Sequence, residues 1–358
     1  MKISTENSPI GKEKGQRIRV LFISHGSGPG GAELSLLGLL KGLDRDRFEP
    51  YVILPCAGKM RAPLEAMGVE VRAPPLEHWI PSSAIWGVGH WWRLMFRLRG
   101  RVAKLASIIR EYRIDLVYTN TVTVIDGALA ALVTRRPHVW HARERYSGND
   151  DIKGYLPGWA IKHVILALSD RVIVNSNALA QAFATSGHRS KVTRIYNGVE
   201  VHAFESPGTS RVDLESQLGI PRSFVLLGMF GRLSERKDPM TLVRAVHQLR
   251  VGGMQVACLF VGQGDQGYVD HLRLVARDLG VDDLVFFAGQ RSDVPALMGA
   301  IDILVLASKD EPFGRVLIEG MAAGVMQYLP SGQTWSLFTA QRARGNSSTD
   351  TRSADTWW

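Results

Sequence analysis

Ala307–Gly324, ASKDEPFGRVLIEGMAAG, is the stretch from which the fold of this chain is inferred. The apolar run Ile301–Leu306 leads into it and predicts a buried strand, and a loop at Ser308–Glu311 follows. Pro312 suits the first turn of a helix, where a missing N–H group removes no hydrogen bond. The stretch therefore predicts a strand–loop–helix unit, whose helix carries an apolar face of Leu317, Ile318, Met321 and Ala322.

Two acidic residues mark this unit. Glu311 precedes the helix and Glu319 lies inside it, which separates them by ~12 Å along a helix axis. A hydrolase carboxylate pair flanks one bond at roughly 5–9.5 Å, so such a pair is disfavoured. The spacing suits an elongated ligand held at two points, with an anion over the amides of Phe313, Gly314 and Arg315. The alternative is an amphipathic helix that happens to carry two acids.

Strands and helices alternate on both sides of Ala307–Gly324. Apolar runs such as Arg19–Ser24 and Val256–Val261 predict strands buried on both faces. Alternation of this kind indicates parallel sheets covered by helices, with ligands at the carboxyl ends of the strands. We predict an α/β chain of two Rossmann-like domains that face each other across a cleft. Its parts are a tail (1–16), a first Rossmann-like domain (17–199), a linker (200–222), a second Rossmann-like domain (223–325) and an irregular tail (326–358).

Composition narrows the class of protein. The chain has 358 residues, 45% of them hydrophobic and 22% charged, as in soluble globular proteins. A net charge of +9 favours anionic partners. Cys56 and Cys258 are the only cysteines, which excludes a disulfide framework and suits a reducing cytosol. The polar N-terminus is not a secretory signal, no apolar run is long enough for a confident transmembrane helix, and no nucleic-acid-binding module is recognisable.

A glycine pattern follows the first predicted strand. Gly26, Gly28 and Gly31 match G-x-G-x-x-G, the dinucleotide-fold signature. That signature also expects an acid at the end of the second strand, and the run Ile53–Cys56 has none. An NAD-dependent oxidoreductase is therefore disfavoured. A loop for phosphate or acceptor, or a tight turn without a ligand, remains.

Basic residues follow the first strand of the second domain. Arg232, Arg236 and Lys237 lie where a diphosphate would bind, and both side-chain types are good phosphate partners. The alternative is a solvated charged loop. His141 ends a strand of the first domain. It could contact a sugar there, or it could have a structural role alone. Asp44 and Asp46 form a D-x-D, but they lie in a connection and do not predict a metal site.

A further basic stretch, Trp86–Arg110, mixes aromatic residues with arginine and lysine at helical spacing. One interpretation is a helix that lies on an anionic membrane surface. The other is a helix that faces the core and has a basic outer side.

Several motifs, taken in order, resemble those of the retaining GT-B glycosyltransferases of family 4, and the resemblance covers roughly residues 17–325. No single motif is specific, but their order and spacing are. The motifs are Gly30–Glu33, His141, Asn197–Val199, Gly231–Pro239, Gly262–Gly264, Phe313–Gly314 and the pair Glu311 and Glu319.

The resemblance implies a role for each matching residue. Arg232 and Lys237 would hold the diphosphate of a nucleotide-sugar donor and stabilise its developing charge. Glu319 would bind the ribose and Glu311 the transferred sugar. Catalytic roles would fall to His141, Arg232, Lys237 and Glu311, and the rest of the donor contacts to Gly30, Gly31, Phe313, Gly314, Arg315 and Glu319.

The resemblance also implies the reaction. Members move a hexosyl group to a glycan or lipid-linked acceptor with retention of configuration, and they use no metal or other cofactor. Many build lipopolysaccharide or other polysaccharides at the inner face of the plasma membrane, so we predict a cytoplasmic, peripheral enzyme that contacts anionic lipid through Trp86–Arg110. Two alternatives are a sugar-nucleotide epimerase of the same fold and a non-catalytic nucleotide-sugar-binding remnant.

The family pattern stops after Gly324. No Pro-Val-Val-type strand, Gly-Gly loop or returning helix is readable in residues 326–358, and the sequence resembles a frameshifted or truncated member. We therefore expect an incomplete second domain, weak activity and a tendency to aggregate, because a lost strand exposes unpaired backbone and apolar surface.

Overall fold

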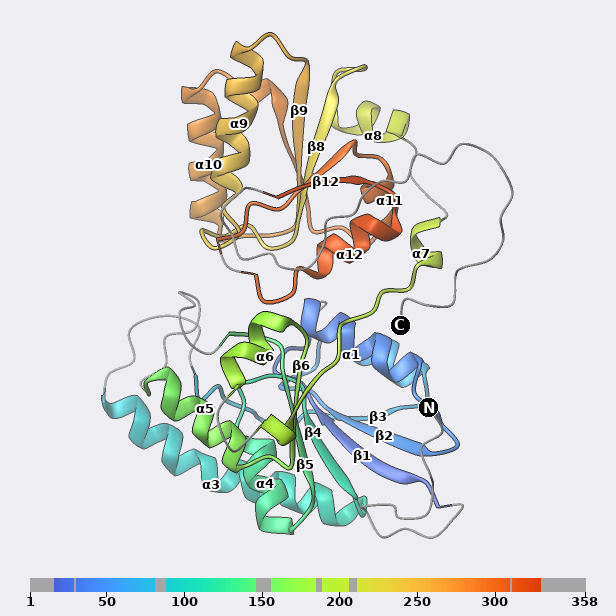
Figure 1. Cartoon of the computed structure of the whole chain (residues 1–358), viewed down its shortest axis with the longest axis vertical. Helices are drawn as coiled ribbons and strands as arrows, with labels where there is room; N and C mark the ends of the chain where they lie inside the picture. The colour runs from blue at the N-terminus through green and yellow to red at the C-terminus, as the bar shows by residue number, and fades with distance from the viewer. Residues whose placement is uncertain are drawn as a thin grey trace.

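The computed structural model describes residues 16–28, 30–80, 88–145, 156–184, 189–205, 211–309 and 311–329. They form two α/β domains, which Figure 1 shows one above the other, joined by the segment that carries α7 (His202–Glu205). The predicted N-terminal tail, apart from Gln16, and residues 330–358 of the predicted C-terminal tail lie outside the described residues. The prediction of two Rossmann-like domains is confirmed.

The described part of the first domain contains a parallel sheet of seven strands in the order β3-β2-β1-β4-β5-β6-β7. This order places a switch point between β1 and β4, where the chain turns from one side of the sheet to the other. The strands are β1 (Ile18–Ile23), β2 (Phe48–Ile53), β3 (Glu70–Arg72), β4 (Leu116–Thr119), β5 (His138–Ala142), β6 (Arg171–Val174) and β7 (Val192–Arg194).

Helices cover both faces of this sheet. They are α1 (Gly31–Lys41), α2 (Arg61–Ala66), α3 (Val88–Glu111), α4 (Asp126–Thr134), α5 (Gly158–Ala167) and α6 (Asn177–Phe183). Along β1, Val20 and Phe22 pack with α1 and α2, whereas Leu21 and Ile23 pack with α3 and α4. The strand is apolar throughout because side chains alternate between two buried faces.

The second domain repeats this plan with a five-stranded parallel sheet in the described residues, ordered β10-β9-β8-β11-β12. Its strands are β8 (Val225–Phe230), β9 (Val256–Val261), β10 (Val285–Gly289), β11 (Ile303–Val305) and β12 (Met326–Tyr328). Its helices are α8 (Arg211–Leu218), α9 (Pro239–Val251), α10 (Gln266–Asp278), α11 (Val294–Gly299) and α12 (Arg315–Ala322). Two apolar clusters, one on each face of β8, form its core.

Three local predictions need correction. Helix α12 begins at Arg315, not at Pro312, because Gly314 adopts a left-handed conformation (φ 73°) that interrupts helical geometry. Residues Arg211–Leu218 form α8, and Leu214 packs in the second core, so the predicted linker is too long. Met326–Tyr328 pairs with β11 as a strand, although the alternation was predicted to end at Gly324. That the second domain is incomplete stays a prediction.

Candidate functional site

Loops that follow the carboxyl ends of the two sheets meet at the junction of the domains. Arg315 at the start of α12 donates from Nη1 to Ser35 Oγ of α1 at 3.1 Å. The rings of Tyr196, after β7, and Phe313, after β11, lie 6.4 Å apart between centroids. In Figure 1 the loop between β11 and α12 approaches the end of the first domain that carries α1. The predicted site residues lie in these loops, in the helices that follow them or at the ends of the strands.

Lys237 and Glu311 form an ion pair at the switch point of the second sheet. Lys237 lies in the loop after β8 and Glu311 in the loop after β11, and β8 and β11 are neighbours. Their side chains are only 15% and 13% exposed. A backbone hydrogen bond from Lys309 N to Arg236 O, 2.8 Å long, joins the two loops. The sequence predicted both residues, and the structure brings them into direct contact.

Arg315 and Glu319 form a second charged pair, one turn apart on α12. Arg315 Nε donates to Glu319 Oε1 at 2.7 Å. Burial raises the pKa of the Glu319 carboxyl, and the neighbouring Arg315 opposes that rise. Each of the two predicted donor carboxylates is thus paired with one cation.

The remaining donor-side residues surround these pairs. Arg232 follows β8 directly and is exposed. Phe313 is half-buried beside Tyr196. Gly314 is the N-cap residue of α12 and, being a glycine, offers no side chain to accept from the first amides of the helix. An exposed cation and the N-terminus of a helix at the same edge of the sheet both favour an anion.

His141 lies at the end of β5, at the carboxyl edge of the first sheet, and is 5% exposed. Its Nδ1 shares a short hydrogen bond with the hydroxyl of Tyr118. Its Nε2 is buried and has no hydrogen-bond partner among the described residues. Burial, with Arg143 nearby, holds the pKa of His141 well below its usual value, so the ring is neutral. Among the described residues no hydrogen bond joins His141 to the Lys237–Glu311 pair.

The glycine turn is supported by a buried carboxylate. Glu33 of α1 accepts a hydrogen bond from Ser24 Oγ at 3.1 Å and is 4% exposed. A Cβ atom at Gly30 would lie 2.5 Å from Glu33 Oε2, whereas a Cβ at Gly31 would meet nothing within 4 Å. A methyl group at Gly30 would therefore displace the buried Glu33 carboxylate, whereas Gly31 faces open space.

Three polar residues share this edge with His141: Arg143 and Asn120, which the sequence did not single out, and Asn197, which it gave only as part of a family motif. Arg143 donates to Asn120 Oδ1 at 2.8 Å and to Asn197 Oδ1 at 2.6 Å. Asn120 follows β4, and Asn197 follows β7. For Arg143 and Asn120, the only indication in the sequence of a place in the site was their position just after a predicted strand.

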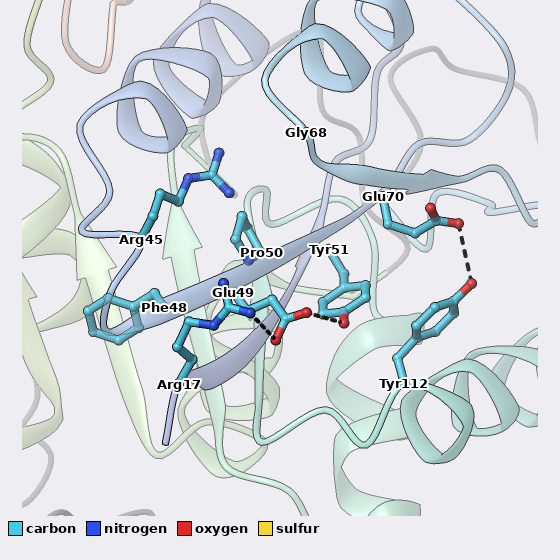
Figure 2. A pocket seen from close by; sticks show the side chains of 9 residues that line it. All are labelled: Arg17, Arg45, Phe48, Glu49, Pro50, Tyr51, Gly68, Glu70 and Tyr112. Carbon is cyan, nitrogen blue, oxygen red and sulfur yellow. Dashed lines mark hydrogen bonds and ion pairs between the residues drawn. The ribbon is translucent and has the colours of Figure 1, made fainter. Parts of the chain in front are cut away.

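A hollow of about 320 Å³ lies at the other end of the first sheet, where β2 and β3 begin (Figure 2). Figure 2 shows that its polar side chains pair with one another: Tyr51 donates to Glu49 at 2.8 Å, and Tyr112 donates to Glu70 at 3.3 Å. None of the predicted site residues lines it. We do not assign it to the candidate site.

The outer face of the first domain carries two large exposed aromatic side chains. Phe96 of α3 is 86% exposed, and Trp159 of α5 is 67% exposed. Arg97 and Arg99 are also exposed beside Phe96. The same helix buries Leu105 and Ile109 in the core, as the second interpretation of Trp86–Arg110 predicts, and contact with a membrane surface stays a prediction. In the described part of the chain no helix is long and apolar enough to cross a membrane.

Comparisons with known families divide the chain as the structure does. The family described as Glycosyltransferase Family 4 matches residues 29–203, and the family described as Glycosyl transferases group 1 matches residues 211–327. The two matches cover one domain each.

Two solved structures of Anabaena Alr3699/HepE, one in complex with UDP and glucose and one with UDP-glucose, are similar to this chain. Each is 30% identical, with coverage of 87% of this chain and 80% of that chain, and the TM-scores are 0.69 and 0.70. The structure of WaaG, a glycosyltransferase of lipopolysaccharide biosynthesis, is 18% identical with a TM-score of 0.59 and supports the fold alone.

Curated relatives extend the comparison. The lipopolysaccharide core biosynthesis glycosyltransferase LpsE of Rhizobium meliloti (strain 1021) is 30% identical over 47% of this chain and 46% of the relative. The D-inositol 3-phosphate glycosyltransferase of Corynebacterium kroppenstedtii is 30% identical over 44% of this chain and 37% of the relative. The chain thus spans less than half the length of these two relatives. The matches do not favour an epimerase.

Proposed function

The chain belongs to the GT-B glycosyltransferases of family 4, and we propose that it transfers a hexosyl group from a nucleotide-sugar donor to a glycan or lipid-linked acceptor. The observation that carries this proposal is the meeting of Lys237, Glu311, Arg315 and Glu319 at the carboxyl edge of the second sheet, across the domain junction from the edge with His141. Since similar structures contain UDP and UDP-glucose, a uridine nucleotide is the first donor to test.

In this proposal the pairs Lys237–Glu311 and Arg315–Glu319 rearrange around the donor. The diphosphate competes with Glu311 for Lys237, and the exposed Arg232 approaches the phosphates from the same loop. Released from the lysine, Glu311 accepts hydrogen bonds from sugar hydroxyls. Glu319 does the same for the ribose. Two cations placed before the reaction begins then stabilise charge as the nucleoside diphosphate leaves.

We further propose that the reaction retains the anomeric configuration. The acceptor oxygen attacks the anomeric carbon on the face from which the diphosphate leaves, the bond from that carbon to the phosphate oxygen breaks, and the acceptor proton passes to the departing phosphate. The neutral His141 positions the transferred sugar through Nε2, which has no partner among the described residues.

The test is a transfer assay with UDP-, GDP- and ADP-hexoses and a panel of glycan and lipid-linked acceptors. The proposal expects one nucleotide class to raise the melting temperature and to support transfer, with an α-donor giving an α-linked product by NMR. A β-linked product would overturn retention. Interconversion of the donor sugar without an acceptor would favour an epimerase, and nucleotide binding without turnover would favour a remnant.

The family resemblance also suggests that no metal is required. The described residues contain no group of three or more metal-ligating side chains. Transfer in the presence of EDTA at the untreated rate is the expected outcome. A loss of activity that Mg²⁺ or Mn²⁺ restores would contradict it.

Peripheral membrane contact is proposed for the face around Phe96 and Trp159. Aromatic side chains that lie at the headgroup level, next to exposed arginines, favour an anionic lipid surface. The protein is expected to sediment with vesicles that contain anionic lipid and to stay in solution with neutral vesicles. Replacing Phe96 and Trp159 by serine should weaken sedimentation, and unchanged sedimentation would contradict the proposal.

A further inference from the structure

Arg143 is a buried charged residue that the proposed donor site does not use. It follows β5 directly and is 7% exposed. Its Nε and Nη1 donate to the side-chain oxygens of Asn120 and Asn197, at 2.8 and 2.6 Å. Both acceptors are neutral amides. In the part of the chain that the structure describes, Arg143 forms no ion pair with a carboxylate.

Two acids lie near Arg143, but neither accepts a hydrogen bond from it, and Glu144 Oε1 has no hydrogen-bond partner among the described residues. Glu33 and Glu144 are close enough to favour the charged guanidinium. However, the Glu33 carboxylate accepts from Ser24, and Glu144 Oε2 accepts from the backbone N–H of Val122 at 3.1 Å. A buried charge without an ionic partner is costly, and neutral amides compensate only part of that cost. Arginine nevertheless stays protonated in proteins, so a positive charge remains at this position.

The charge has a defined place in the fold. Asn120, Arg143 and Asn197 follow β4, β5 and β7, so all three lie at the carboxyl edge of the first sheet. Asn120 Nδ2 also donates to Ala32 O at 3.1 Å, which ties the group to the start of α1 beside the glycine turn. His141 lies two residues before Arg143, and after burial the charge of Arg143 is the second cause that lowers the pKa of His141.

A second guanidinium approaches the same region from the other domain. Arg315 is close enough to Arg143 to disfavour its charged form, and it contacts Ser35 of the first domain. Arg315 is paired with Glu319, so of the two cations it is Arg143, buried without an ionic partner among the described residues, that an anion would stabilise most. A planar guanidinium suits a carboxylate or a phosphate.

We propose that Arg143 binds an anionic group, a carboxylate or a phosphate, carried by the acceptor. This inference rests on the proposed glycosyltransferase function. The donor diphosphate is expected at Lys237 and Arg232 in the second domain, whereas Arg143 belongs to the first domain beside His141. The acceptor is therefore an acidic sugar or a phosphorylated molecule, not a neutral glycan.

The test is calorimetric titration of protein saturated with UDP, which occupies the diphosphate position, with three probes: glucuronate, inorganic phosphate and glucose. The variants are Arg143→Gln, Arg143→Lys and, as a matched control, Arg171→Gln. Arg171 is exposed at the start of β6, the opposite edge of the same sheet, and its replacement removes the same charge.

The wild type is expected to bind glucuronate or phosphate at least tenfold more tightly than glucose, and the anion that binds more tightly identifies the acceptor group. Arg143→Gln should abolish the difference, Arg143→Lys should keep part of it, and Arg171→Gln should keep all of it. Equal affinities in the wild type, or an Arg143→Gln variant that retains the preference while it folds and binds UDP, would overturn the proposal. Failure of the wild type to bind any of UDP, GDP and ADP would instead count against the proposed function, and if GDP or ADP binds in place of UDP the titrations are made with that nucleotide.

Discussion

The two edges that meet at the domain junction are built from different chemistry. The edge of the second domain consists of charged residues that pair with each other, Lys237 with Glu311 and Arg315 with Glu319. The edge of the first domain consists mainly of buried neutral groups, and two of them, His141 Nε2 and Asn175 Oδ1, have no hydrogen-bond partner among the described residues.

This difference indicates that the two edges have different roles in binding the substrates. Paired charges can open around a diphosphate, because the anion offers the cations a stronger partner than a single carboxylate. Buried neutral groups without partners cannot exchange one ion for another, but they direct hydrogen bonds to a sugar held in one orientation. We interpret the second edge as the one that binds the donor and the first as the one that orients the reacting sugar and the acceptor.

The largest effect is expected from Lys237→Met. It removes a cation from the leaving diphosphate and leaves the carboxylate of Glu311 buried without its partner, so kcat should fall by about 10³-fold. Steady-state transfer assays measure this. The matched control is Lys41→Met, which breaks the exposed pair of Lys41 with Glu200 at the same junction and should change the rate less than twofold. An equal loss of kcat in both variants would contradict a role of Lys237 in stabilising the leaving diphosphate.

His141→Ala is expected to have the next largest effect. Loss of a group that orients the transferred sugar should lower kcat by about 10²-fold, in the range of single positioned catalytic groups. The short hydrogen bond to Tyr118 predicts that Tyr118→Phe gives a smaller loss of the same kind. A Tyr118→Phe variant less active than His141→Ala would show that the hydroxyl, not the imidazole, acts on the substrate.

Replacing each of two neighbouring glycines by alanine should have smaller and opposite effects on stability. Gly30→Ala places a methyl group against the buried Glu33, so it should lower the melting temperature. Gly31→Ala meets only open space and adds a helix-favouring residue, so it should keep or raise the melting temperature. If ligand occupies that space, Gly31→Ala raises KM about tenfold. Unchanged kinetics in Gly31→Ala would place the ligand elsewhere.

The first domain should also be sensitive to acid. Burial lowers the pKa of His138 from 6.5 to about 4, and it holds the pKa of His141 well below its usual value. Below pH 6.5 these histidines bind protons in the unfolded chain but stay neutral in the folded protein. The free energy of unfolding therefore falls as the pH falls, by about 1.4 kcal/mol per pH unit for each histidine. Urea unfolding at pH 7.5, 6.5 and 5.5 checks this. Equal stability at all three values would contradict the buried neutral state.

Much of the fold follows from the sequence, because apolar runs such as Val256–Val261 match strands buried on both faces. Motifs in the sequence identify the candidate site residues, but they do not show which of these residues contact each other. Lys237 and Glu311 lie 74 positions apart and pair only because β8 and β11 are neighbours. The start of α12 was misplaced because proline at a helix start is a common signal, and the left-handed Gly314 after it decides otherwise. Arg143 gave no signal, since its importance lies in burial without an ionic partner.

The most direct test of this division of work is UDP binding to the wild type, Lys237→Met and His141→Ala, measured by calorimetry in one buffer. We predict at least tenfold weaker binding for Lys237→Met and binding within twofold of the wild type for His141→Ala. Equal weakening in both variants, or unchanged binding in Lys237→Met, would contradict the assignment of the donor to the charged edge of the second domain.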